Sequence, residues 1–218
     1  PVSLSNEVKK TISEVYGLQG SLIPVVYNGI DLSKCIEKDN YAPTKEFTVV
    51  QIGRFMKVKN HKVLLQAFAV FAEKRKNVKL QLLGEGELLD ETRELAKVLG
   101  VADKVEFLGL QPNVYPYLNK ADVFCLPSEY EGVPMTLIEA MGTGLPIVAS
   151  NVGGIPDMLE NEKNALLVEP NDIAVEAAFE MLYSDIELRT RLGRAAKIRS
   201  EAFSAKTMAE EYIKIYKN

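Results

Sequence analysis

The sequence has little of what metal sites and disulfide frameworks are built from. Its 218 residues include one histidine, His61, two cysteines, Cys35 and Cys125, and no tryptophan. A lone histidine without a cysteine cluster argues against a His/Cys metal site. Cys125 lies within the apolar run "DVFCLP", so we expect it to be a buried, reduced thiol, as is usual in cytoplasmic proteins. His61 stands at the start of a helical pattern, which favours a structural role over a catalytic one.

The sequence also lacks strong charge and long hydrophobic runs. The formal net charge is −4 and the sequence pI is near 5.3, which disfavours nucleic acid or an anionic membrane as a partner of this chain. No apolar run approaches the roughly 20 residues that span a bilayer. No signal peptide is visible, and because the chain starts at Pro1 rather than Met, we expect residues upstream of it.

Apolar runs alternate with amphipathic segments along most of the chain. The expected strands are 47–53, 78–84, 104–109, 122–127, 146–150 and 164–170. The expected helices are 61–74, 87–100, 113–120, 134–141, 172–185, 186–203 and a last one after Ser204, with Asn171 and Asp185 as N-caps. Such alternation predicts an α/β fold, a Rossmann-like doubly wound parallel sheet.

The first residues follow a different pattern. "LSNEVKKTISEVYGL" is typical of an amphipathic helix over 5–16, with Val8, Ile12 and Val15 on one face. "SLIPVVYNGID" indicates a short strand that runs into a turn. We therefore expect two parts, a lead-in over 1–28 and a domain over 29–218.

The stretch "SEYEGVPMTLIEAMGTGLP" contains the most suggestive group of residues. Pro134 suits the first position of a helix, so Glu131 would precede the helix and Glu139 would lie on its second turn. Free N–H groups at such a helix start bind phosphate, and carboxylates accept hydrogen bonds from sugar hydroxyls. The spacing fits equally well a first-turn acid and a solvated helical glutamate.

Two other stretches follow expected strands. "GRFMKVKN" places Arg54 and Lys59 where they could neutralise a diphosphate, although solvated surface charge is the alternative. "LLGEGELL" carries Gly84 and Gly86 but has Leu89 at the position of the third glycine of a dinucleotide fingerprint. No Asp-x-Asp is present to hold a metal on a diphosphate, so we expect a site without metal or cofactor.

These stretches together resemble the group 1 family of retaining glycosyltransferases, which have the GT-B fold. The similarity rests on the Glu-x7-Glu region in "EGVPMTLIEAMGTGLPIVAS" and its continuation "NVGGIPDMLENEKNALLVEPND". It extends, in the order of the family, to "VVYNGID", "VVQIGRFMKVKNHKVLLQAF", "LLGEGEL" and "VEFLG". Five ordered motifs cover nearly the whole chain, about the length of the family's C-terminal domain.

The resemblance implies a role for each candidate residue. Glu131 would contact hydroxyls of the donor sugar, Glu139 would hold the ribose, and Arg54 with Lys59 would clamp the diphosphate. Pro134 departs from the glycine that many members have there, and it cannot donate an N–H. The remaining donor-binding residues would be those of the amide-bearing turn, the glycine turn and the base-binding loop: Gly132, Val133, Met135, Thr136, Gly84, Leu108, Leu110 and Gln111.

The resemblance further implies that the chain is the donor-binding half of a hexosyltransferase. Residues 1–28 would be the end of an N-terminal domain that the chain otherwise lacks, and the last helix would dock on that domain. The enzyme would be cytoplasmic, at the inner membrane through the other domain, and would build polysaccharide from a UDP-, GDP- or ADP-sugar and a glycan or lipid-linked acceptor. This half alone would not transfer. A non-catalytic nucleotide-binding module and an NAD-dependent oxidoreductase are the alternatives.

Overall fold

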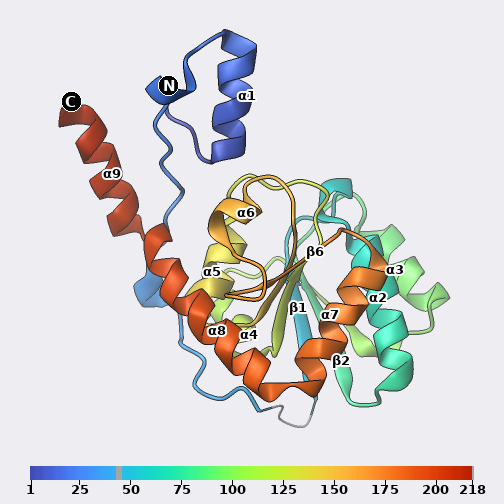
Figure 1. Cartoon of the computed structure of the whole chain (residues 1–218). Coiled ribbons are helices and arrows are strands. Elements are labelled where there is room, and N and C mark those ends of the chain that lie inside the picture. The colour runs from blue at the N-terminus through green and yellow to red at the C-terminus, as the bar shows by residue number, and fades with distance from the viewer. Residues whose placement is uncertain (43–45, 218) are drawn as a thin grey trace.

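A six-stranded, all-parallel sheet forms the centre of the computed structural model, which describes residues 1–42 and 46–217 (Figure 1). The order across the sheet is β3-β2-β1-β4-β5-β6, so the chain builds one half outward from β1 and then returns to build the other. This order is that of the dinucleotide-binding Rossmann fold. The strands are β1 Phe47–Ile52, β2 Val78–Leu83, β3 Val105–Gly109, β4 Val123–Leu126, β5 Ile147–Ser150 and β6 Leu166–Val168.

Helices cover both faces of the sheet, as the alternating pattern predicts. Those between or after the strands are α2 His61–Lys74, α3 Leu89–Val98, α4 Tyr115–Lys120, α5 Met135–Thr143, α6 Ile155–Met158, α7 Asp172–Ser184 and α8 Ile186–Ser200. Two more lie near the ends of the chain, α1 Asn6–Tyr16 and α9 Ala205–Lys217. The α/β doubly wound class expected from the sequence is therefore confirmed.

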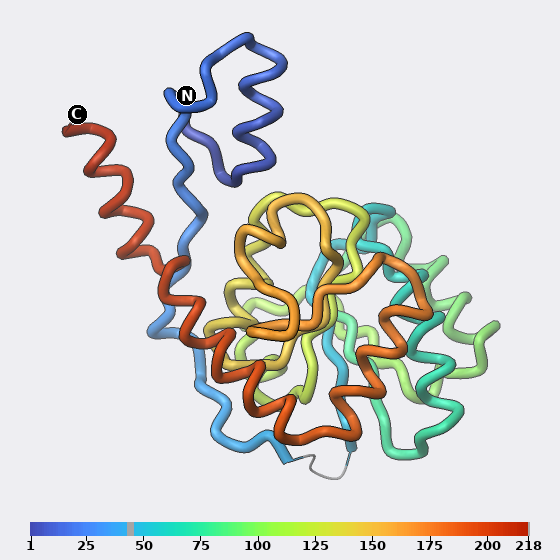
Figure 2. The backbone as a smooth tube through the Cα atoms, in the orientation of Figure 1, coloured from blue at the N-terminus to red at the C-terminus, as the bar shows by residue number. Residues whose placement is uncertain are grey.

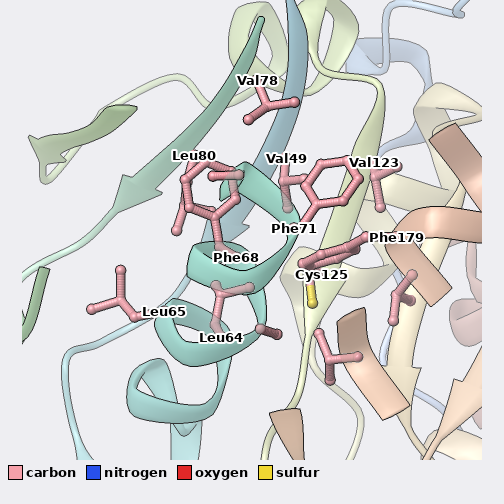
Figure 3. Packing of buried hydrophobic residues seen from close by; sticks show 14 of the residues in the cluster. Val49, Leu64, Leu65, Phe68, Phe71, Val78, Leu80, Val123, Cys125 and Phe179 are labelled. Carbon is pink, nitrogen blue, oxygen red and sulfur yellow. The ribbon is translucent and has the colours of Figure 1, made fainter. Parts of the chain in front are cut away.

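One apolar layer lies between the sheet and helices α2 and α7. Phe71 of α2 and Phe179 of α7 lie beside Val123 and Cys125 of β4, and Phe68 of α2 lies on the side of Leu80 of β2 (Figure 3). A second layer on the opposite face joins Phe124 and Leu126 of β4 to α4, α5 and α8. Successive residues of β4 thus alternate between two buried faces, which explains why the strand is a continuous apolar run rather than an alternating one.

Capping residues end several helices where the sequence indicates. The Asn171 side chain accepts a hydrogen bond from the N–H of Ala174, and Asp185 accepts one from the N–H of Leu188, so both expected N-caps are confirmed. Gly144 ends α5 in the left-handed conformation, with φ +73°. Gly142, two residues earlier, lies inside the helix.

Two local expectations are wrong. Pro134 is the N-cap of α5, with an extended backbone, and the helix begins at Met135. The expected strand in "SLIPVVYNGID" is a short 3₁₀ turn followed by extended chain that makes two isolated bridges, Ser3 with Val25 and Ile30 with Ser204. A strand needs a neighbour to pair with, and this segment runs outside the sheet (Figure 1).

The first and last helices extend away from the sheet and its covering layers (Figure 2). Neither α1 nor α9 contains a buried residue. The start of α1 contacts the domain through Asn6, whose N–H donates to Asp157 at 2.7 Å, and Tyr27 packs edge-on against Phe203. Among the residues that the structure describes, no helix is long and apolar enough to cross a membrane. The division into 1–28 and 29–218 stays a prediction.

Candidate functional site

The carboxyl ends of the strands are where the loops with the candidate residues gather. The sheet order reverses between β1 and β4, and the loops that follow these two strands diverge toward opposite halves. Open α/β sheets bind ligands at such a reversal. Arg54 and Lys59 follow β1, and Glu131 follows β4, so the fold brings residues from distant parts of the chain to one edge.

A pocket of about 530 Å³ opens beside the ends of β1, β2 and β3. Arg54, Gly84, Leu110 and Gln111 all line it, so the structure brings together four of the residues singled out in the sequence. Arg54 is exposed, and in the described part of the chain its guanidinium has no hydrogen bond or ion pair. The Gln111 side chain instead donates to the carbonyl of Leu108 at 2.5 Å, which folds the loop after β3 onto itself.

Glycines allow the loops around this pocket to approach closely. A Cβ on Gly84 would lie 2.1 Å from the carbonyl oxygen of Gly53, and a Cβ on Gly86 would lie 2.4 Å from that of Phe55. The two loops are also joined by backbone hydrogen bonds, including Phe55 N–H to the Glu85 carbonyl at 2.9 Å. The glycine turn therefore serves close loop packing in addition to lining the pocket.

Lys59 and Glu131 form a close ion pair. The Lys59 Nζ lies 2.6 Å from Oε1 of Glu131, and the side chains are 18% and 8% exposed. Ser128 donates its hydroxyl to the same Oε1 at 2.7 Å. The two residues that the resemblance assigns to diphosphate and sugar thus contact each other, and Ser128, which sequence analysis missed, joins them. Its position three residues before Glu131 was the available signal.

Hydrogen bonds from neighbouring residues hold the loop that carries Lys59. The fully buried Gln51 donates to the carbonyl of Lys59 at 3.0 Å. Asn60, which has a positive φ of 53°, donates its side-chain amide to the carbonyl of Pro127 at 3.1 Å. The N–H of Glu129 donates to the carbonyl of Val58 at 2.9 Å. Because these bonds join the loops after β1 and β4, the ion pair is held in place before any ligand arrives.

The start of α5 presents a row of unused donors. Within residues 1–42 and 46–217, the N–H groups of Gly132, Val133, Met135 and Thr136 have no hydrogen-bond partner. The first N–H groups of a helix have no intrahelical acceptor and lie at the positive end of its dipole. Pro134 interrupts the row with a residue that cannot donate. The arrangement is suited to an anion.

Glu139 differs from Glu131 in its surroundings. It lies on α5 beside Tyr115 of α4 and Cys35, and in the described chain its carboxylate has no hydrogen bond. Burial raises the pKa of Glu139 above its ordinary value of 4.5. Burial also raises the pKa of Tyr115 to about 12, and the neighbouring Cys35 and Glu139 add to this effect. A half-buried acceptor without a donor is ready to bind a hydroxyl.

Two glycines after β5 hold the backbone of Glu131. A Cβ on Gly153, which has φ +59°, would lie 1.9 Å from the Glu131 carbonyl oxygen, and one on Gly154 would lie 2.2 Å from that of Gly132. The N–H of Gly154 donates to the Glu131 carbonyl at 2.9 Å. These contacts support the site, and no local pattern in the sequence indicates which loop the glycines face.

The structural interpretation of His61 and Cys125 agrees with the coordinates. The His61 ring is buried and stacks on Phe55 with ring centroids 4.1 Å apart. Burial, followed by the nearby Lys59 charge, lowers the pKa of His61 to about 4, so the ring is neutral at physiological pH. Cys125 is a fully buried free thiol, and burial raises its pKa. In the part of the chain that the structure describes, no cluster of three His, Cys, Asp or Glu residues could hold a metal.

Comparison with known proteins adds a family to this geometry. The family model for glycosyl transferases group 1 matches residues 34–199. The N-acetylgalactosaminyltransferase of Campylobacter jejuni that acts on a diphospho-undecaprenol acceptor is 31% identical over 87% of this chain and 52% of its own length. The chain spans about half the length of the curated relatives it matches.

Solved structures have the same fold. Anabaena HepE in complex with UDP superimposes with a TM-score of 0.90 at 20% identity, over 99% of this chain and 63% of that one. The C-terminal domain of a group 1 glycosyltransferase from Francisella tularensis superimposes with a TM-score of 0.71 at 22% identity, over 80% of this chain and 97% of that domain. With its strand order, its strand-end site and the match over residues 34–199, this chain belongs to the group 1 family of glycosyltransferases.

Proposed function

We propose that this chain binds the nucleoside diphosphate sugar of a retaining hexosyltransferase and forms the donor half of its cleft. The observation that carries the proposal is an exposed Arg54, unpaired among the residues that the structure describes, on a pocket of about 530 Å³. It lies at the strand edge where α5 begins with N–H groups that have no partner in the same described residues. A guanidinium and a helix start both favour phosphate oxygens.

Each part of the donor has a matching group. The diphosphate would lie between Arg54 and the N–H groups of Gly132, Val133, Met135 and Thr136, and the base would enter the pocket that Leu110 and Gln111 line. The unpartnered carboxylate of Glu139 would accept the ribose hydroxyls. Glu131 would accept a hydroxyl of the sugar, with Lys59 bound to it and within reach of the sugar–phosphate junction.

The match to this chain covers only about half of the length of the relatives, which supports a further domain that binds the acceptor. The name of the Campylobacter relative supports a glycan or lipid-linked acceptor for the whole enzyme. The UDP bound to HepE supports a uridine nucleotide as donor, although GDP- and ADP-sugars carry the same diphosphate and ribose. A pathway of polysaccharide assembly is consistent with both.

The reaction that we propose keeps the configuration of the sugar. The bond between the anomeric carbon and the diphosphate oxygen breaks, and the acceptor oxygen bonds to that carbon on the same face. The acceptor proton passes to the departing diphosphate, so the chain need not supply a general base. Its part is to bind the donor and to stabilise the charge of the leaving diphosphate through Arg54 and the free N–H groups.

Of the two alternatives, the oxidoreductase has only the strand order in its favour. Leu89 occupies the position of the third fingerprint glycine, and Gly84 and Gly86 are accounted for by close packing against the loop after β1. A non-catalytic module would bind the same nucleotide, so it differs from our proposal only in whether the longer protein transfers a sugar. An assay of sugar transfer by the longer protein separates the two.

A thermal-shift panel tests the proposal with this chain as it is. UDP, GDP, ADP and their sugar conjugates are each added with EDTA and, separately, with Mg²⁺. We expect at least one nucleotide and its sugar conjugate to raise the Tm equally with and without metal, because a ligand that binds the folded state stabilises it by RT ln(1 + [L]/Kd).

Two exposed arginines give the matched control. Arg54→Ala should reduce the shift strongly, whereas Arg194→Ala on the outer face of α8 should leave it unchanged. Absence of a shift with every ligand would refute donor binding. A shift that appears only with Mg²⁺ would refute the metal-free site.

A further inference from the structure

We propose that Ser128 is a positioning residue that fixes the carboxylate of Glu131 and so decides which of its two oxygens meets the sugar. Neither oxygen is distinguished by the sequence. The proposal rests on the donor-binding function above and adds to it the residue that sets the geometry of the sugar contact.

The hydrogen bonds around Glu131 are unevenly divided between its oxygens. Ser128 and Lys59 both donate to Oε1, at 2.7 and 2.6 Å. In the described chain Oε2 has no hydrogen-bond partner, yet it is not among the buried polar atoms that lack one, so solvent reaches it. Oε1 is therefore anchored to the protein, and Oε2 is the oxygen left for a ligand hydroxyl.

Ser128 is better suited than Lys59 to fix the carboxylate. Its side chain is fully buried, and the flanking backbone is fixed on both sides, at the Pro127 carbonyl by Asn60 and at the Glu129 N–H by the Val58 carbonyl. The lysine ammonium is a point charge on a flexible stem, and it attracts either oxygen with little preference for direction. The serine hydroxyl lies on a short side chain and donates a directional hydrogen bond to Oε1.

The anchoring of Oε1 should affect how tightly the sugar is bound. A carboxylate whose rotation is already restricted loses less entropy when it accepts a hydroxyl, which strengthens a contact that the diphosphate does not make. Removing the serine hydroxyl should therefore weaken the sugar-bearing ligand and leave the nucleoside diphosphate unaffected. A purely structural role would instead weaken both ligands together, through loss of the folded state.

The experiment compares three variants with the wild-type chain. Ser128→Ala removes the hydroxyl, Ser128→Cys keeps the volume but supplies only a weak donor, and Ser200→Ala is the control. Ser200 is also fully buried and donates to the carbonyl of Lys197. Both residues lie on α8, far along the chain from Ser128. Calorimetry gives the affinity for UDP and for UDP-glucose, or for whichever nucleotide and sugar conjugate the panel identifies, and the Tm of each variant is recorded.

We expect both Ser128 variants to lose about tenfold in affinity for the sugar conjugate, the effect of one hydrogen bond to a charged group, with affinity for the nucleotide unchanged within twofold. Ser200→Ala should lower only the Tm. In addition, a crystal structure of Ser128→Ala without ligand should show the Glu131 carboxylate rotated or in several orientations.

Either of two results would overturn the proposal: a carboxylate that stays in place in the Ser128→Ala crystal, or an unchanged ratio of the two affinities, as when both ligands are weakened equally. A wild-type chain that binds no nucleotide at all would refute the proposed function instead, and the crystal structure would still decide the positioning role.

Discussion

At the residue scale, the two glutamates of the Glu-x7-Glu stretch are held in opposite ways. Glu131 is buried and accepts two hydrogen bonds on one oxygen, from Lys59 and Ser128. Glu139 is half-buried and, in the described chain, has no donor for its carboxylate. An anchored acceptor suits an orienting contact to the sugar, and an unpartnered one suits hydroxyls that supply the missing donors.

The first prediction separates the two by ligand. Glu139→Gln should weaken the nucleoside diphosphate and the nucleotide sugar alike, by about tenfold for a hydrogen bond to a charged acceptor. Glu131→Gln should weaken the nucleotide sugar only. Calorimetric titration of each variant with both ligands measures this. The reverse pattern would mean that the roles of the two glutamates are exchanged.

The second prediction concerns Glu139 and pH. Because burial raises its pKa, the folded chain holds the Glu139 proton more tightly than the unfolded chain does. The stability that this adds is complete below the ordinary pKa of 4.5 and is lost as pH rises through the raised value. Glu139→Gln should therefore raise the Tm at about pH 7.5 and leave it unchanged at about pH 4.

A matched variant at an exposed carboxylate gives the baseline for this measurement. Glu187→Gln in the first turn of α8 should lower the Tm slightly at about pH 7.5, because it removes a negative charge from a helix N-terminus, so a rise in Tm is expected for Glu139→Gln alone. The combination expected of Glu139→Gln, a more stable protein that binds nucleotide less well, is typical of a residue kept for function at some cost in stability. A Tm gain of the same size at both pH values would show that burial of the charge is not the cause.

The third prediction concerns Arg54. Because its guanidinium is exposed and unpaired in the described structure, Arg54→Ala should leave the Tm of the free chain unchanged. The affinity for the nucleoside diphosphate should fall by about 1.5–3 kcal/mol, the value of a hydrogen bond to a charged group. Arg54→Lys should lose less, because it keeps the charge but not the fork of donors. Equal, wild-type affinity for both variants would leave Arg54 as surface charge.

At the scale of elements, the site is an assembly of loops that glycines allow to touch. The loop after β5 presses on the backbone of Glu131, and the loop after β2 presses on that of Gly53 and Phe55. Side chains in these loops are therefore positioned by neighbouring loops as much as by their own strands. A substitution in one loop should therefore displace the backbone of the neighbouring loop.

The fourth prediction uses two glycines with similar backbones. Gly153 and Gly100 have φ of +59° and +70°, but only Gly153 has a neighbour, the Glu131 carbonyl, where a Cβ would lie. Gly100→Ala should cost about 1–2 kcal/mol of stability for its left-handed conformation and leave binding unchanged. Gly153→Ala should cost more and weaken the nucleotide sugar.

Chemical denaturation and calorimetry on both variants measure this difference. Both variants lose stability because alanine disfavours the left-handed backbone. Subtracting the loss of Gly100→Ala from that of Gly153→Ala therefore leaves the cost of displacing the loop that carries Glu131. Wild-type binding by Gly153→Ala would show that the contact with the loop after β5 does not position Glu131.

At the scale of the whole molecule, the domain has its own core, and the first and last helices lie outside it. The two apolar layers of the sheet are formed mainly by strands and helices between β1 and α8, and the flanking Ile30 and Phe203 pack into the second layer. The N-terminal part of the chain meets this domain through Asn6, which donates to Asp157, and through Tyr27, which packs against Phe203. Because the domain has its own core, we expect the isolated chain to fold. The exposed helices α1 and α9 carry apolar side chains that another surface could cover.

The fifth prediction follows from this arrangement. The 218-residue chain should unfold cooperatively and bind donor weakly, yet transfer no sugar, because one wall of the cleft orients neither the acceptor nor the closing groups. A radiolabelled-donor assay of this chain beside the longer enzyme measures transfer. A comparable rate from the chain alone would contradict the proposal that it is half of the catalytic unit.

The sequence by itself determined the class of fold and the identity of most of the candidate residues. Continuous apolar runs alternating with amphipathic segments require a parallel sheet covered on both faces, because both faces of each strand must leave water. Helix caps at Asn171 and Asp185 act on the nearest backbone groups, so local sequence suffices to find them. The segment 21–31 does not form the strand that its sequence predicts, because an extended run becomes a strand only with a partner, and partners are not local.

Tertiary structure alone decided how the candidate residues relate to one another. The sequence separates Lys59 from Glu131 by a long stretch of chain, and it gives no sign that they form an ion pair or that Ser128 shares the same oxygen. Nor does it tell which glutamate is anchored and which is left without a donor. Such relations require loops that follow different strands to be placed to within a few tenths of an ångström. The packing of the whole sheet sets that placement.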